Sequence, residues 1–192
     1  MTQINTDCFV EFPVLKTKRL SLREIRKADA EMIFAMRANG RMNQFIARED
    51  MANPEDADQL VERVRKTFGN RDGIGWAGIL RDKNEIVGTC GFNSIDYPNL
   101  HAEIGGELSV DYWGKNIAIE AVTAIIGFGL NQLNLHTIEA KVNPENRGAI
   151  FLMEQIGFKK EAHFRERIFF QGKFSDLAVY CLVKGEEKLN SF

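Results

Sequence analysis

Residues 103–130 combine a short strand-like run, a polar turn and a long apolar run of helical character. The turn reads Asp111-Tyr-Trp-Gly-Lys-Asn116. The first turn of a helix has unpaired backbone N–H groups and a partial positive charge, so a helix that begins near Asn116 can bind a pyrophosphate. Small side chains at Gly114 and Ala118 would let such a ligand approach the backbone. The pattern therefore predicts an anion-binding loop.

Two carboxylates on the strand before this turn are candidates for proton transfer. Glu103 and Glu107 alternate along the strand with Gly105 and Ser109, so all four residues are expected to face the same side. If that side borders a substrate cleft, either carboxylate can act as a general base. The alternative is that both are solvated or salt-bridged strand residues, as surface carboxylates usually are.

The remaining side chains that could hold a metal are far apart in the sequence. They are His101, His136, His163, Cys8, Cys90 and Cys181. None of their spacings is typical of a metal site, so we expect no metal. Cysteines without such spacing, in a chain whose first residues do not resemble a signal peptide, favour reduced thiols and a cytoplasmic location.

Composition is that of an ordinary globular protein. The chain has 192 residues, of which 44% are hydrophobic, and a formal net charge of −2. Because there is no basic excess, we expect no nucleic-acid partner. The longest apolar run, residues 121–130, is too short to span a bilayer, so we expect no membrane partner.

Periodicity and turn residues predict a mixed α/β sandwich. No repeat or linker divides the chain, so we expect a single domain over residues 1–192, with its core at about 15–184. Strands are expected at 19–23, 75–80, 85–92, 103–110, 137–142, 161–170 and 174–183, and helices at 27–38, 53–68, 117–133 and 147–156.

This order of elements resembles the GCN5-related N-acetyltransferases (GNAT), and within them the RimJ/RimL-type branch, whose best known members acetylate protein N-termini. Four segments carry the resemblance: 15–23, 103–121, Asn143-Pro-Glu-Asn146 with Ala149-Ile150, and Ile156-Gly-Phe158 followed by Glu161. The resemblance implies a central, mostly antiparallel, twisted sheet flanked by helices, with acetyl-CoA as the co-substrate. It also implies direct attack of an amine on the thioester.

The family's cofactor loop, usually written Q/R-x-x-G-x-G/A, corresponds here to Trp113-Gly-Lys-Asn-Ile-Ala118. Asn116 stands at a usual glycine position, and Asn tolerates left-handed backbone better than other residues with a side chain, so we expect the loop to keep its shape. The resemblance places the cofactor against this loop, the end of the preceding strand and one later asparagine. The residues concerned are Leu108, Ser109, Val110, Trp113, Gly114, Lys115, Asn116, Ile117, Ala118 and Asn146.

Two catalytic positions depart from the resemblance. Met153 stands where many GNAT enzymes have the tyrosine that protonates the departing thiolate, and Ala149 stands where the RimJ/RimL branch often has a serine. Neither side chain can donate a proton. Glu103 lies near the strand glutamate that acts as the base in some members, allowing one residue of shift.

The sequence does not identify the amine that accepts the acetyl group. The RimJ/RimL resemblance favours the α-amine of a protein N-terminus, such as that of a ribosomal protein. The alternatives are a small-molecule amine (a polyamine, an amino sugar or an antibiotic) and a non-catalytic CoA-binding or sensor domain. The aromatic residues Phe164, Phe169 and Phe170 are candidates for a wall of the acceptor pocket. Dimers are common in the family, so a homodimer is among the expected states.

Overall fold

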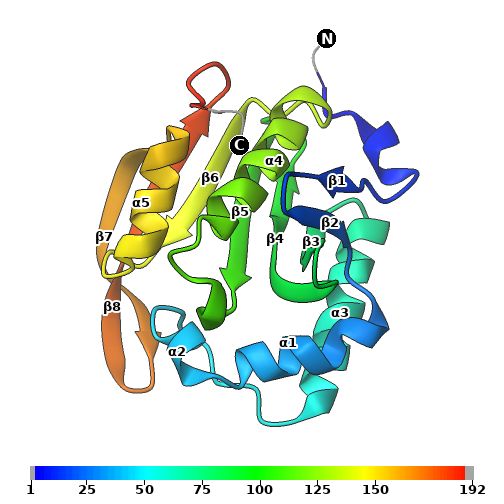
Figure 1. Cartoon of the computed structure of the whole chain (residues 1–192). Coiled ribbons are helices and arrows are strands. Elements are labelled where there is room, and N and C mark those ends of the chain that lie inside the picture. The colour runs from blue at the N-terminus through cyan, green and yellow to red at the C-terminus, as the bar shows by residue number, and fades with distance from the viewer. Residues whose placement is uncertain (1–2, 189–192) are drawn as a thin grey trace.

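Eight strands form one sheet in the computed structural model, which describes residues 3–188 (Figure 1). Their order across the sheet is β1-β2-β3-β4-β5-β6-β8-β7, and every neighbouring pair is antiparallel except β5 and β6. The strands are β1 (Leu15–Lys16), β2 (Leu20–Glu24), β3 (Ile74–Leu80), β4 (Glu85–Asp96), β5 (His101–Leu108), β6 (Thr137–Val142), β7 (Lys159–Phe170) and β8 (Lys173–Val183).

Helices pack on both faces of this sheet, which confirms the predicted mixed α/β fold. One buried cluster joins β3 and β4 to α1 and α3, and a larger one joins the opposite face to α4 and α5. The α-helices are α1 (Ala30–Arg37), α2 (Gly40–Asn43), α3 (Pro54–Gly69), α4 (Ile117–Asn131) and α5 (Arg147–Ile156). Short 3₁₀ turns lie at η1 (Thr6–Phe9), η2 (Lys27–Asp29) and η3 (Val110–Tyr112). Within the described residues, no helix is both long and apolar enough to cross a bilayer.

The predicted elements differ from the observed ones mainly at their ends. Strand β5 begins at His101 and stops at Leu108, because Val110 already belongs to a 3₁₀ turn. The sequence did not predict β1 or α2, since two-residue and four-residue elements are too short to show a period. Asn39 caps α2 by accepting a hydrogen bond from the Arg41 amide at 3.1 Å.

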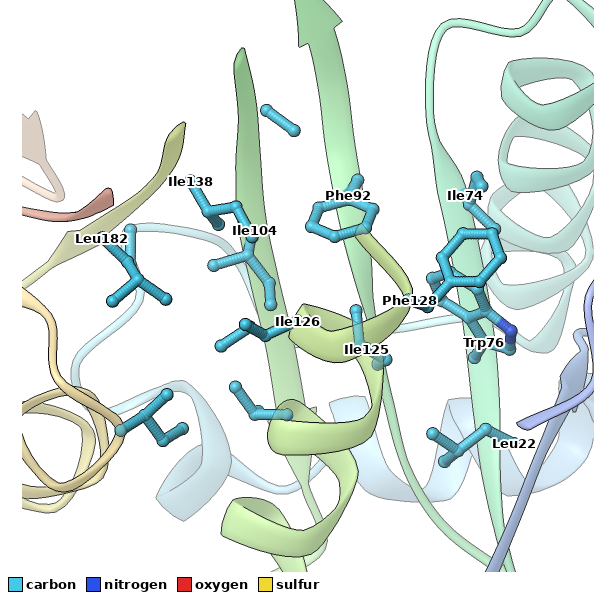
Figure 2. Close-up of a cluster of buried hydrophobic side chains, with 14 of the residues drawn as sticks. Leu22, Ile74, Trp76, Phe92, Ile104, Ile125, Ile126, Phe128, Ile138 and Leu182 are labelled. Carbon is cyan, nitrogen blue, oxygen red and sulfur yellow. The ribbon is translucent and has the colours of Figure 1, made fainter. Parts of the chain in front are cut away.

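Helix α4 lies across the middle of the sheet on a core of large apolar side chains (Figure 2). The Trp76 ring meets Phe92 and Phe128 edge-on, with centroids 6.3 and 5.5 Å apart, and its Nε1 donates to the Pro13 carbonyl at 2.7 Å. A Cβ on Gly129 would lie 2.6 Å from the Phe92 ring, so only glycine lets the helix come this close. This packing fixes where the N-terminus of α4 points.

Strands β5 and β6 are paired only in their first halves. The parallel register runs from His101 opposite Thr137 to Ile104 opposite Ala140. Beyond that point β5 continues to Leu108 along β4 alone, and β6 follows β8. The backbone edge of β5 that faces β6 is therefore left without a strand partner over residues 105–108.

An ion pair with a buried carboxylate ties the first strands to α4. Glu120 in the first turn of α4 is 4% exposed, and its carboxylate accepts from the Thr17 hydroxyl, from the Arg19 amide at 2.7 Å and from Arg19 Nε at 2.7 Å. The rest of the same guanidinium donates to the carbonyls of Lys115 and Asn116, each at 2.8 Å. Burial acts to raise the pKa of Glu120, but these hydrogen bonds outweigh it and leave the pKa below its usual value.

We predict that Glu120→Gln lowers the free energy of unfolding at about pH 7 by about 1–3 kcal/mol, because it removes a buried, hydrogen-bonded charge. A depressed carboxyl pKa adds stability above the unfolded-state pKa, near 4.5, and that stability is lost as the pH falls through the lower native pKa. Urea denaturation of both proteins across this range should show the two stabilities converging at acid pH. Glu186→Gln, which removes an exposed pair with Lys159, should change little. A difference that stays constant with pH would contradict this account.

Candidate active site

A cavity of about 590 Å³ opens where β5 and β6 separate. Residues 104–108 of β5 and residues 140–143 at the end of β6 form two of its walls. A third wall is the start of α4 with the loop before it, and the first half of α5 closes the fourth side. Met42, Phe45 and Ile46, which lie between α1 and α3, line it as well. The cavity is therefore bounded by the predicted anion-binding loop and by a segment that the sequence did not single out.

The loop has the left-handed geometry that the sequence predicted for Asn116. Its φ and ψ are 58° and 23°, and Gly114 also has a positive φ of 72°. Helix α4 begins at the next residue, Ile117, so the amides of its first turn have no partners within the helix. Because Arg19 holds the carbonyls of Lys115 and Asn116, their oxygens are satisfied on the side of β2. The amides that open α4 remain for a ligand.

Most residues of the predicted cofactor set lie at the cavity. Those that line it are Leu108, Trp113, Gly114, Ile117, Ala118 and Asn146. The amide of Asn116 belongs to the same loop, while its side chain lies outside the lining. Asn146 caps α5, with its Oδ1 accepting from the Ala149 amide at 3.0 Å.

The other three predicted cofactor residues have different surroundings. The Ser109 amide donates to the Val87 carbonyl at 2.7 Å, and Val110 begins the 3₁₀ turn. The Lys115 ammonium lies over the Tyr112 ring, 5.2 Å from its centroid. None of the three side chains lines the cavity, as far as residues 3–188 show. The Leu108 carbonyl accepts from the Trp113 indole at 2.8 Å, which ties the end of β5 to the loop.

The two candidate bases share one face of β5 but differ in their contacts. Glu107 lines the cavity, with a side chain only 4% exposed, and both its oxygens are ion-paired: one with Arg37 Nε at 2.7 Å, the other with Arg48 Nη2 at 2.6 Å. Glu103 comes directly before the lining residue Ile104 but does not itself line the cavity, and its side chain is 24% exposed. Its partners are Lys141 Nζ at 2.6 Å and Asn93 Nδ2 at 3.4 Å.

Lys141 connects Glu103 to the cavity. Its side chain lines the cavity and also lies 3.5 Å from Glu139 on the same strand. The hydrogen bond with Glu103 raises the pKa of Lys141, so this group is a cation at neutral pH. In the described chain, Glu107 and Lys141 are the only charged residues that line the cavity.

The two positions where the family resemblance would place a tyrosine and a serine do face the cavity. Met153 and Ala149 both line it, on the side of α5. Cys90 lines it too, but burial raises the pKa of its thiol to about 12, so it stays protonated at neutral pH. The hairpin aromatics do not form a wall of the cavity: in the part of the chain that is described, Phe164, Phe169 and Phe170 all lie outside the lining. Phe164 and Phe169 are exposed.

The β7–β8 hairpin contacts the segment that supplies Phe45 and Ile46 to the cavity lining. Gln171 at its tip donates to Glu49 at 3.0 Å, and Glu49 belongs to the segment between α2 and α3 (Figure 1). Arg37 and Arg48, which hold Glu107, were not singled out from the sequence. They lie 70 and 59 residues from it, and no local pattern marks them.

Comparison with known proteins agrees with this geometry. The family model described as "Acetyltransferase (GNAT) domain" matches residues 19–159. A Bacillus subtilis protein, the uncharacterized N-acetyltransferase YoaA, is 33% identical over 176 residues, which is 92% of this chain and 99% of that protein. An acetyltransferase of the GNAT family from Bacillus anthracis superposes with a TM-score of 0.78 at 26% identity, covering 89% of this chain and 98% of the other.

Relatives whose names state a substrate are more distant. Spermidine N(1)-acetyltransferase from Vibrio cholerae is 26% identical over 160 residues, covering 83% of this chain and 90% of its own. The ribosomal protein uS5 alanine N-acetyltransferase from Escherichia coli is 28% identical over 102 residues, 53% of each chain.

The RimL acetyltransferase for ribosomal L7/L12, solved with coenzyme A, shares the fold with a TM-score of 0.83 at 15% identity, covering 89% of this chain and 98% of its own. Fold, family match and relatives together confirm the resemblance seen in the sequence. The chain belongs to the GNAT family, and it is an acetyl-CoA-dependent N-acetyltransferase similar to the RimJ/RimL-type enzymes.

Proposed function

We propose that this enzyme acetylates the α-amine of a polypeptide N-terminus, and that the acceptor reaches the thioester from the side of Met42, Phe45 and Ile46. The observation that carries the proposal is the charge of the cavity. Among the described residues, its one lining carboxylate is Glu107, which two guanidinium groups neutralise. Its other lining charge, Lys141, is paired with Glu103 and Glu139, so the lining offers no free carboxylate to a second ammonium group.

This charge distribution discriminates between acceptor classes. A polyamine keeps one or more ammonium groups beside the amine that is acetylated, and these need free carboxylates near the site. A peptide N-terminus has a single amine followed by a neutral backbone and a side chain that an apolar wall can accept. The uS5 alanine acetyltransferase among the relatives fits this second class. The spermidine acetyltransferase, which matches more of the chain, keeps the polyamine as the alternative.

Acetyl-CoA would occupy the opening between β5 and β6. We assign its pyrophosphate to the amides of Gly114 to Ala118, with the left-handed Asn116 turning the backbone toward the ligand. The Trp113 amide at the start of this loop already donates to the Val110 carbonyl. The free edge of β5 is suited to pair with the pantetheine arm as an added strand. Asn146 is placed to contact that arm from the start of α5. A backbone amide near Leu108 would stabilise the oxyanion.

The chemistry then needs a proton acceptor and no enzyme nucleophile. Glu103 is the better candidate of the two carboxylates, because it has access to solvent and a chain of contact to the cavity through Lys141. A water can pass the proton of the amine to it. With Met153 and Ala149 unable to donate, the departing thiolate takes its proton from water.

The loop assignment predicts the behaviour of substitutions at Asn116. Asn116→Gly should bind acetyl-CoA within about 2-fold of the native protein, whereas Asn116→Val should weaken binding about 10-fold or more, since a β-branched residue resists positive φ. Calorimetric titration measures both. Asn84→Val is the matched control, because Asn84 has a similar φ of 52° in the β3–β4 turn, away from the cavity. Equal losses for both valine variants would show that the effect is general destabilisation.

A panel of amines tests the acceptor class. With acetyl-CoA and a thiol-detecting reagent, peptides with free N-termini should give kcat/KM values at least about 10-fold above that of spermidine. The same peptides with blocked N-termini and a free lysine should react poorly. The proposal fails if spermidine, an amino sugar or an aminoglycoside is the best substrate.

Glu103→Gln tests the base. It should lower kcat about 100-fold and remove the acid limb of the pH–rate profile, with little change in acetyl-CoA affinity. Glu139→Gln is its control, since Glu139 lies on the adjacent strand and also faces Lys141. An unchanged pH–rate profile in Glu103→Gln would remove Glu103 from the mechanism.

A further inference from the structure

We infer that Glu107 is a positioning residue that holds the segment 38–50 against the cavity and so determines which amines fit. The inference rests on the proposed function in taking this side as the acceptor side. Segment 38–50 connects α1 to the approach to α3 and contains α2, its one helix, of four residues. Three of its side chains, Met42, Phe45 and Ile46, line the cavity.

Glu107 joins three parts of the chain at one buried point. Its Oε1 accepts from Arg37 Nε at 2.7 Å, from the end of α1, and its Oε2 accepts from Arg48 Nη2 at 2.6 Å. Thr89 on the neighbouring strand donates to it at 3.3 Å. Since each oxygen already meets a guanidinium, this carboxylate is poorly placed to take a proton from an amine or to bind an ammonium group.

A second layer of contacts orients the arginines. Asn43, which is 8% exposed, accepts from Arg48 Nε at 2.7 Å and donates to the Arg37 carbonyl at 2.9 Å. It also donates to Asp50. Asn43 lies between Met42 and Phe45 in the sequence, so the polar contacts and the cavity-lining side chains belong to the same few residues. A change in the polar contacts of Asn43 should therefore also displace the cavity-lining side chains of Met42 and Phe45.

Side-chain hydrogen bonds therefore hold this segment in place, as backbone hydrogen bonds do in a strand or a long helix. A four-residue helix supplies few backbone hydrogen bonds of its own, and such a stretch is the kind that opens locally when its contacts are removed. The Arg37 side chain is only 18% exposed, so its guanidinium has limited contact with water, and this burial lowers its pKa in spite of Glu107. Without Glu107, two desolvated cations would face each other, and the segment should swing away from β5.

The expected consequence is a loss of amine recognition with the cofactor site intact. Glu107→Gln should raise KM for the best amine of the panel about 10–100-fold, because small misplacements of a positioning group have effects of this size. The affinity for acetyl-CoA should stay within about 2-fold, and the acid limb of the pH–rate profile should remain. Arg48→Lys should have a smaller effect in the same direction, and it serves if Glu107→Gln folds poorly. Glu24→Gln, which breaks an exposed pair with Arg65, is the matched control and should change neither constant.

Hydrogen–deuterium exchange gives a readout that does not depend on knowing the amine. In Glu107→Gln, amides of residues 38–50 should exchange faster than in the native protein, while those of α4 should not change. The inference is overturned by unchanged exchange over 38–50, by an equal loss of acetyl-CoA affinity, or by loss of the acid limb, which would make Glu107 the base. If the panel identifies a polyamine instead of a peptide, the proposed function fails, and the exchange result still decides the role of Glu107.

Discussion

The orientation of the peptide groups at the start of α4 is the constraint on which the proposed cofactor site depends. For their N–H groups to face a ligand, their carbonyls must point the other way and find a partner there. Arg19 meets this need for Lys115 and Asn116, and Glu120 fixes Arg19 from within α4 itself. The core around Trp76 and Gly129 then sets where α4 lies against the sheet. The proposed pyrophosphate loop is thus held in shape by Arg19, Glu120 and the core, which lie outside the loop itself.

The separation of β5 from β6 gives the two carboxylates of β5 different surroundings. Glu103 lies where the strands are still paired, beside Lys141 and solvent. Glu107 lies beyond the last pair, where its carboxylate meets arginines from α1 and the following segment. Alternation along a strand predicts which side a residue faces, and it holds for both. The chemical role open to each carboxylate depends on its ion-pair partners, and the alternating pattern of the strand does not predict those partners.

The sequence alone predicted features that depend on neighbouring residues, and it did not predict contacts between distant ones. Elements with a clear period and a clear stop were predicted to the residue, as for β6 and for α5, which ends at a left-handed Gly157. The left-handed Asn116 was predicted as well, because the requirement is local to the loop. The end of β5 was misplaced because Ser109 still bonds to β4 while the chain has already begun to turn. The charged partners of Glu107, Glu103 and Glu120 come from 38 or more residues away in sequence, so only the folded chain brings them together.

On the proposed assignment, cofactor binding and acceptor choice depend on different parts of the chain. The proposed cofactor side consists of regular structure: a strand edge, a helix N-terminus and a loop whose positive φ angles fall on Gly114 and Asn116. The proposed acceptor side consists largely of an irregular segment held by side-chain hydrogen bonds and ion pairs. Backbone geometry constrains sequence weakly, so the first arrangement can persist while side chains change. A site held by particular arginines and one carboxylate changes shape when any of them is replaced.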